Sequence, residues 1–145
     1  LPVPKGLFAS VIYPHFEILP KNTRRILSSN VVLDHCIQQS GNLGGFIIGL
    51  YNSDFELIHR SLDDVLIEPK ISNLIPGFFE IKNAALASGA LGCSISGTGP
   101  SIFALCQNSS IAEDVGSSMK KTFDQFNISS DLFISSINNE GAILY

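Results

Sequence analysis

A glycine-rich turn between two apolar runs holds the residue types in this sequence that could do chemistry. It consists of Ser96, Gly97, Thr98, Gly99, Pro100 and Ser101. Glycine adopts positive φ without a Cβ clash, whereas proline fixes its own φ and carries no N–H. Such a turn can present several backbone N–H groups outward, and fixed N–H groups bind anions such as phosphate. We therefore predict an anion-binding loop here, with a plain hairpin turn as the alternative.

The other polar residues form no pattern for metal binding or nucleophilic catalysis. The three histidines fall in separate predicted elements, without the spacing of a metal site or a catalytic triad. Ser94 and Ser96 have no histidine near them in the sequence that could activate them. The adjacent carboxylates of Asp63 and Asp64 are typical of a solvated helix end. We therefore predict no catalytic residue and no metal ligand in this chain.

The turn needs a strand on each side to hold it, and runs of β-forming residues flank it on both sides. Further strands are predicted at residues 7–13 and 131–137, with a short one at 142–145. Apolar residues at helical spacing and capping residues predict helices at residues 20–27, 32–50, 54–62, 79–88 and 111–126. Hairpin-paired strands with helical crossovers predict an α+β fold, a ferredoxin-like antiparallel sheet with helices packed on one face.

The long helix predicted at residues 32–50, with an N-cap from residues 28–30, contains an unusual number of glycines. They are Gly41, Gly44, Gly45 and Gly49. Each glycine in a helix interior costs about 1 kcal/mol relative to alanine. The simplest compensation is close packing against another backbone, where a side chain would not fit.

Composition limits the class of protein. The 145 residues are enough for one domain, with 45% hydrophobic and 15% charged residues. A net charge of -4 gives no cationic field for nucleic acid, and no apolar stretch is long enough to cross a membrane. Cys36, Cys93 and Cys106 are predicted to be buried free thiols, which favours a cytoplasmic location.

Four runs of sequence, taken in order, resemble one family of enzymes. They are Asp-Val-Leu-Ile-Glu-Pro at residues 64–69, Leu-Ile-Pro-Gly-Phe at 74–78, Gly-Ala-Leu-Gly at 89–92 and Ser-Ile-Ser-Gly-Thr-Gly-Pro-Ser at 94–101. Together they resemble the C-terminal half of homoserine kinases, members of a small-molecule kinase family that includes galactokinase, mevalonate kinase and phosphomevalonate kinase. The resemblance covers residues 9–144.

This resemblance implies that residues 1–145 are a single C-terminal kinase domain. The complete enzyme would transfer the γ-phosphate of ATP to the side-chain hydroxyl of homoserine, in threonine biosynthesis. In the family, ATP and Mg²⁺ are bound mainly by an N-terminal domain of the same polypeptide. A Pro-x-x-x-Gly-Leu-Gly-Ser-Ser loop of that domain wraps the ATP phosphates, and this sequence lacks such a loop. We therefore expect this chain to be inactive alone. The resemblance assigns the glycine-rich turn to the transferred phosphate, and we expect Gly97, Thr98 and Gly99 to contact it.

The resemblance also suggests how the homoserine carboxylate would be bound. A family arginine aligns with Arg24, or with Arg25 in an alternative register. A second family arginine, two residues after the proline of Glu-Pro, falls here on Ile71, and Lys70 stands beside it. Lysine supplies a point charge but not the bidentate fork of arginine. Either homoserine is held by Arg24 and Lys70, or the substrate differs.

Two other functions fit parts of the sequence. One is a stand-alone ferredoxin-like regulatory module that binds an amino acid without ATP. The other is another kinase of the same family, which would share the turn but not the Glu-Pro and Ile-Pro-Gly-Phe runs. A domain without its other half would also expose an apolar face, which can promote a homodimer.

Overall fold

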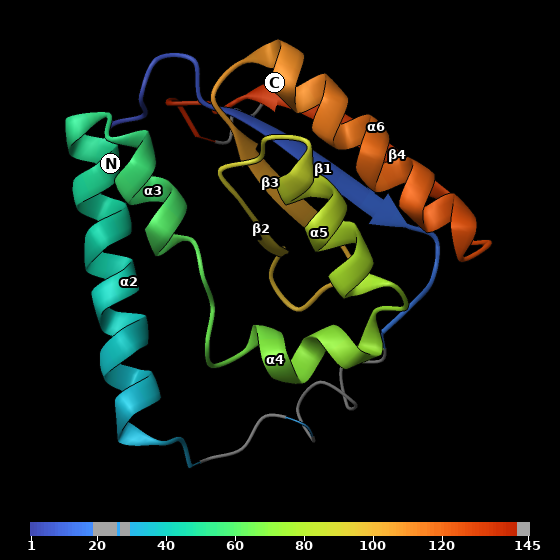
Figure 1. The fold of residues 1–145 in the computed structure, drawn as a ribbon, viewed down its shortest axis with the longest axis horizontal. Coiled ribbons are helices and arrows are strands. Elements are labelled where there is room, and N and C mark those ends of the chain that lie inside the picture. Colours follow the sequence, from blue (N-terminus) through green and yellow to red (C-terminus); the bar gives the residue numbers. More distant parts are fainter. Residues whose placement is uncertain (19–25, 27–29, 142–145) are drawn as a thin grey trace.

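The computed structural model describes residues 1–18, 26 and 30–141 (Figure 1). The strand predicted at 142–145, and all of the helix predicted at 20–27 except Ile26, lie outside these residues. The remaining helices and strands predicted from the sequence are present, with ends shifted by a few residues.

The strands form one antiparallel sheet. They are β1 (Phe8–Pro14), β2 (Gly92–Ile95), β3 (Ile102–Cys106) and β4 (Ser130–Ser136), in the spatial order β2-β3-β1-β4. The helices are α2 (Leu33–Asn52), α3 (Phe55–Ser61), α4 (Glu68–Ile71), α5 (Phe78–Ala87) and α6 (Ser109–Gln125), with a 3₁₀ turn at Ser72–Leu74. This is the ferredoxin-like α+β plan with extra helices in the first crossover, as predicted.

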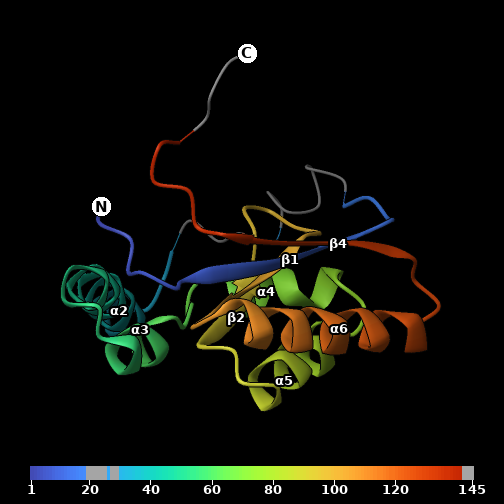
Figure 2. The same cartoon turned by 90° about the horizontal axis from the view of Figure 1, so that it is seen from above.

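The main core lies between one face of the sheet and the helices α5 and α6, which Figure 2 shows together on that side. Alternate residues of β3, such as Ile102 and Ala104, point into this core, and Phe78 of α5 and Phe123 of α6 fill it. Helix α6 begins at Ser109, two residues before the predicted start, because the Asn108 side chain caps it by accepting the Ile111 N–H at 2.8 Å.

Helices α2 and α3 pack beside the sheet and bring a second apolar cluster to its other face. This cluster includes Leu105, whose side chain alternates with the core residues of β3, together with Leu50 and Ile58. Asp54 caps α3, as predicted, by accepting the Leu57 N–H at 2.9 Å. The N-cap of α2 is Val32, whose side chain makes no capping hydrogen bond.

The close packing against another backbone that we predicted for the glycines of α2 is confirmed for one of the four. A Cβ on Gly49 would lie 3.1 Å from the Ile58 nitrogen and 3.2 Å from the Asp54 carbonyl oxygen, whereas Gly45 packs closely against the Ser61 side chain. A Cβ on Gly41 or Gly44 would meet nothing within 4 Å. For these two the prediction is wrong within the described residues, because no described segment packs against them.

The three cysteines are free thiols, as predicted, but only Cys93 and Cys106 are buried and Cys36 is half-buried. Burial raises the pKa of Cys93 to about 12 and that of Cys106 to about 11. Both thiols are therefore protonated at neutral pH. In the part of the chain that the structure describes, no helix is both long enough and apolar enough to cross a membrane.

Candidate functional site

The glycine-rich turn connects β2 to β3 and is closed by two backbone hydrogen bonds. The Ser96 N–H donates to the Ser101 carbonyl at 2.8 Å, and the Gly99 N–H donates to the Ser96 carbonyl at 3.0 Å. Gly97 has φ +61° and Gly99 has φ +76°. A side chain would be strained at either position, which explains the two glycines.

The tip of the turn presents two free amides. The N–H groups of Gly97 and Thr98 donate no hydrogen bond to any described residue, and both residues are exposed. The Gly99 N–H is used to close the turn, so a contact of Gly99 with a phosphate would not use this N–H. Two adjacent exposed amides, fixed by a closed turn, can bind an anionic oxygen without reorganisation.

The base of the turn rests on apolar side chains from three segments. A Cβ on Gly99 would lie 3.2 Å from Ile18, 3.3 Å from Ile75 and 3.4 Å from Ile95. Ile75 belongs to the Leu-Ile-Pro-Gly-Phe run and is buried. Ile18 stands six residues before Arg24 in the chain. The fold therefore joins two of the four recognised runs at this turn.

A buried polar cluster supports the strand that leads into the turn. Glu68 is 5% exposed, and one of its carboxylate oxygens accepts the Ser94 hydroxyl at 2.6 Å. Its other oxygen pairs with the Lys82 ammonium. These contacts join α4, β2 and α5, so they fix the position of β2 relative to both helices.

The Asp-Val-Leu-Ile-Glu-Pro run places Glu68 through its first residue. One oxygen of Asp64 accepts the N–H groups of Leu66 and Ile67, at 2.9 and 2.8 Å, and the other accepts the Glu68 N–H at 3.2 Å. Asp64 therefore fixes the turn that leads into α4 and is not the solvated residue that we predicted. Asp63 is exposed, and its carboxylate lies 3.9 Å from Lys82.

The predicted substrate-binding residues are not brought to the turn by any described contact. Arg24 and the alternative Arg25 lie outside the described residues. Lys70 is half-buried in a small cavity of about 140 Å³ near the start of α2, which it shares with Val32 and His35. Ile71, where the family places an arginine, is 1% exposed and packs in the interior.

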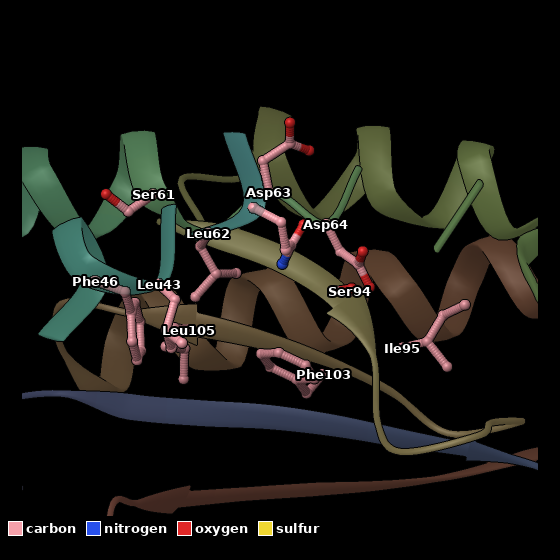
Figure 3. Close-up of a pocket in the computed structure, with 11 residues that line it drawn as sticks. Leu43, Phe46, Ser61, Leu62, Asp63, Asp64, Ser94, Ile95, Phe103 and Leu105 are labelled. Carbon is pink, nitrogen blue, oxygen red and sulfur yellow. The ribbon is translucent and has the colours of Figure 1, made fainter. Parts of the chain in front are cut away.

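A larger cavity of about 300 Å³ lies between α2 and strands β2 and β3 (Figure 3). Its wall is mainly apolar and includes Phe46 of α2 and Phe103 of β3. Two of its polar groups are used within the protein: the Ser94 hydroxyl donates to Glu68, and the Gln39 side chain accepts the Val65 N–H. Among the described residues, no lysine or arginine lines this cavity, so these residues do not suit a carboxylate or a phosphate.

One polar contact away from the turn and the two cavities was not predicted from the sequence. His15 lies between Ser129 and Asp131, with its ring nitrogens 3.0 Å from the serine oxygen and 2.9 Å from the carboxylate. The pairing of β1 with β4 creates this contact, so spacing along the chain could not reveal it. All three residues are exposed and line neither of the two cavities.

Comparison with known proteins gives a consistent set of relatives. Residues 40–125 match the family model described as GHMP kinases C terminal. The chain is 44% identical over 144 residues to a homoserine kinase of Chlorobium phaeobacteroides, covering 98% of this chain and 45% of the relative. It is 45% identical over 141 residues to a homoserine kinase of Chlorobaculum tepidum, covering 96% and 44%. The chain thus spans less than half the length of these relatives.

Solved structures agree with this comparison. The crystal structure of homoserine kinase from Cytophaga hutchinsonii superposes with a TM-score of 0.93 and 50% identity, covering 95% of this chain and 44% of that one. Phosphomevalonate kinase from Streptococcus pneumoniae, in complex with phosphomevalonate and AMPPNP, has a TM-score of 0.62 at 11% identity and covers 90% and 41%. The second similarity shows a shared fold alone.

Proposed function

The chain belongs to the GHMP kinase C-terminal domain family, and from this we propose that it is the substrate-side domain of an ATP-dependent homoserine kinase. Support comes from relatives named homoserine kinase that are 44% and 45% identical along nearly the whole chain. The rest of the same polypeptide, as in those longer relatives, would be its partner and would hold ATP. The products would be ADP and O-phosphohomoserine, an intermediate suited to threonine biosynthesis.

The single observation that carries a role for this domain is the pair of free amides at Gly97 and Thr98. Charge on the phosphoryl oxygens must be stabilised as the group passes from ATP to the homoserine hydroxyl. Two N–H groups already fixed by the closed turn would donate to one of these oxygens. Ser96, Thr98 and Ser101 would add hydroxyls around it, with Pro100 keeping the turn rigid.

Mg²⁺ is not assigned to this domain. Within residues 1–18, 26 and 30–141, no group of three or more His, Cys, Asp or Glu side chains could hold a metal ion. The resemblance to the kinase family supports a site for the metal with ATP on the remainder of the polypeptide, and no step on this chain depends on it. The contribution of this domain is positioning and charge stabilisation, which account for most of the catalysis of phosphoryl transfer.

Arg24 is the proposed ligand of the homoserine carboxylate, with Lys70 as a second positive charge. The chain reaches Arg24 shortly after Ile18, which lies against the base of the turn. A guanidinium would bind the carboxylate of homoserine in a bidentate pair. The burial of Ile71 leaves no room for a substrate contact at that position.

The test uses the polypeptide as encoded, assayed for ATP-dependent phosphorylation of homoserine, mevalonate and phosphomevalonate. We expect activity on homoserine, and Arg24→Ala should raise the KM for homoserine about 30-fold with an unchanged KM for ATP, because one charge-assisted contact is lost. Arg60→Ala, which removes an exposed arginine of α3, is the matched control. Activity on mevalonate instead of homoserine, or homoserine binding without any kinase activity, would overturn the proposal.

A further inference from the structure

The larger of the two cavities described above has no part in the proposed transfer of phosphate. Its volume of about 300 Å³ lies at the lower end of the range for sites that bind small molecules. Figure 3 shows the side chains of Leu43, Leu62 and Phe103 around one space. The apolar lining consists of Leu43, Phe46, Leu62, Ile95, Phe103 and Leu105. Such a wall favours a ligand with an apolar body.

The charged groups of this cavity already have partners. Asp63 and Asp64 are the only charged residues among the described residues that line it. The Asp64 carboxylate accepts three backbone N–H groups, and the Asp63 carboxylate lies 3.9 Å from the Lys82 ammonium. An anion or a cation that entered the cavity would lose its water without gaining a free countercharge. The cavity therefore suits a neutral molecule.

Two polar groups of the lining have hydrogen-bonding capacity left. The Gln39 side-chain oxygen accepts the Val65 N–H at 3.0 Å, and its NH₂ group donates to no described residue. Ser61 is 9% exposed, and its hydroxyl likewise makes no hydrogen bond to a described residue. An apolar side chain from another protein segment would leave both groups unpaired, whereas the carbonyl oxygen of a ligand could accept a hydrogen bond from them.

The cavity also borders both strands that hold the glycine-rich turn. Ser94 and Ile95 line it at the end of β2, and Phe103, the register partner of Ser94, lines it from β3. The next residue after Ile95 is Ser96, whose N–H and carbonyl close the turn. Ile95 also lies against the base of the turn, 3.4 Å from where a Cβ on Gly99 would stand. A molecule in the cavity would therefore contact the residues that position the turn.

We propose that this cavity is a regulatory ligand site, which takes a small neutral molecule with an apolar body and a carbonyl oxygen. The carbonyl oxygen accepts a hydrogen bond from the Gln39 amide, with the Ser61 hydroxyl as a second donor on the wall. The bound molecule shifts the turn at residues 96–101 through Ile95, because it binds two arrangements of the turn unequally. The effect on catalysis rests on the function proposed above, whereas binding and the shift of the turn do not.

The binding experiment uses three probes of similar size and different charge: benzamide, benzoate and benzylammonium. Each is titrated into the ¹⁵N-labelled polypeptide as encoded, and NMR gives the dissociation constants. Benzamide should bind at least tenfold more tightly than either charged probe. Leu43→Trp, which fills the cavity, should weaken benzamide binding at least tenfold, and Gln39→Leu should weaken it about fivefold by removing one hydrogen bond. Ile48→Trp, an exposed position of α2 outside the cavity, is the matched control, and circular dichroism checks folding.

The same titration tests the connection to the turn. Benzamide should shift the amide resonances of Gly97 and Thr98 in the unmodified polypeptide and in Ile48→Trp, but not in Leu43→Trp. Saturating benzamide should also change kcat for homoserine at least twofold. A polypeptide without kinase activity would contradict the proposed function, but the binding constants and the resonance shifts would still test the cavity.

Four results would overturn this inference. Absence of benzamide binding would mean that another segment of the polypeptide covers the cavity. Equal binding of the charged probes would exclude the proposed ligand chemistry. Binding that Leu43→Trp leaves unchanged would place the site elsewhere. Binding without shifts at Gly97 and Thr98 would exclude a regulatory effect on the turn.

Discussion

The tip of the glycine-rich turn and the polar cluster behind it differ in whether their hydrogen-bonding groups have partners within the domain. Behind the turn, Glu68, Ser94 and Lys82 satisfy one another in a largely buried cluster. At the tip, the amides of Gly97 and Thr98 are exposed and donate to no described residue. The domain thus completes its own scaffold and leaves open the groups that would meet an anion carried by another part of the enzyme.

This difference separates stability from activity. Changes in the cluster should lower the free energy of unfolding, whereas changes at the tip should lower the rate of phosphoryl transfer and leave the fold intact. The following predictions test that separation, in order of the expected size of the effect.

The largest effect should come from Glu68→Ala. It leaves the half-buried Lys82 without its main partner and the Ser94 hydroxyl without an acceptor. Breaking a buried ion pair of this kind should cost about 3 kcal/mol of unfolding free energy. Urea denaturation followed by circular dichroism measures it. Glu80→Ala, an exposed acid of α5, should cost less than about 1 kcal/mol. Equal losses of unfolding free energy in the two variants would show that Glu68 has no special role in stabilising the fold.

Thr98→Pro should give the next largest effect, on catalysis. Proline removes one of the two free amides. Loss of one donor to a developing anionic oxygen lowers kcat about 100-fold. Steady-state kinetics of the polypeptide as encoded gives kcat, and thermal unfolding should change little. The hydroxyl control is Thr98→Val, which keeps the amide and should keep most of the activity. A large loss in Thr98→Val and none in Thr98→Pro would assign the role to the hydroxyl instead.

Substituting each of the two turn glycines by alanine should show that the base of the turn is packed and that its tip is open. Gly99→Ala combines positive φ with a Cβ only 3.2 to 3.4 Å from three isoleucines, so it should cost about 2 kcal/mol. Gly97→Ala has the same backbone strain but open space around the Cβ, so it should cost about 1 kcal/mol. The measurement is again urea denaturation. A Gly97→Ala loss as large as that of Gly99→Ala would mean that the tip is packed.

The smallest effect is a dependence of stability on pH that comes from Cys93, a buried thiol next to the polar cluster. The pKa of Cys93, next to Ser94, is raised from 9.0 to about 12 by burial. Its stabilising contribution is therefore complete below pH 9 and is lost as pH rises toward 12. Between pH 8 and about pH 10 this thiol should account for about 1 kcal/mol of lost stability. Cys93→Val should reduce that loss. An unchanged pH profile in this variant would show that the thiol is not buried as described.

The sequence alone was enough to predict the parts of the fold that depend on residues close together in the chain. The turn, its two glycines and the Asp54 cap depend on residues close together in the chain, and all were predicted correctly. The Glu68 cluster could not be, because Lys82 and Ser94 stand 14 and 26 residues away from Glu68 and meet it only after α4, α5 and β2 have packed.

Two other differences have physical causes of the same kind. The four-residue helix α4 is too short to show a periodic pattern, and Asp64 fixes the turn that leads into it by accepting three backbone N–H groups. Composition indicates how many hydrogen-bond donors the glycine-rich turn has. It does not indicate which of them, such as the Gly99 N–H, the turn uses to close itself.

The most direct test of the central claim is to observe the amides themselves. In the polypeptide as encoded, labelled with ¹⁵N, the amide resonances of Gly97, Thr98 and Gly99 would be followed as AMPPNP, Mg²⁺ and homoserine are added. We expect large shifts for Gly97 and Thr98 and protection of both amides from hydrogen exchange, with Gly99 protected even before addition. Resonances of Gly97 and Thr98 that neither shift nor gain protection would contradict a phosphate-binding role for this turn.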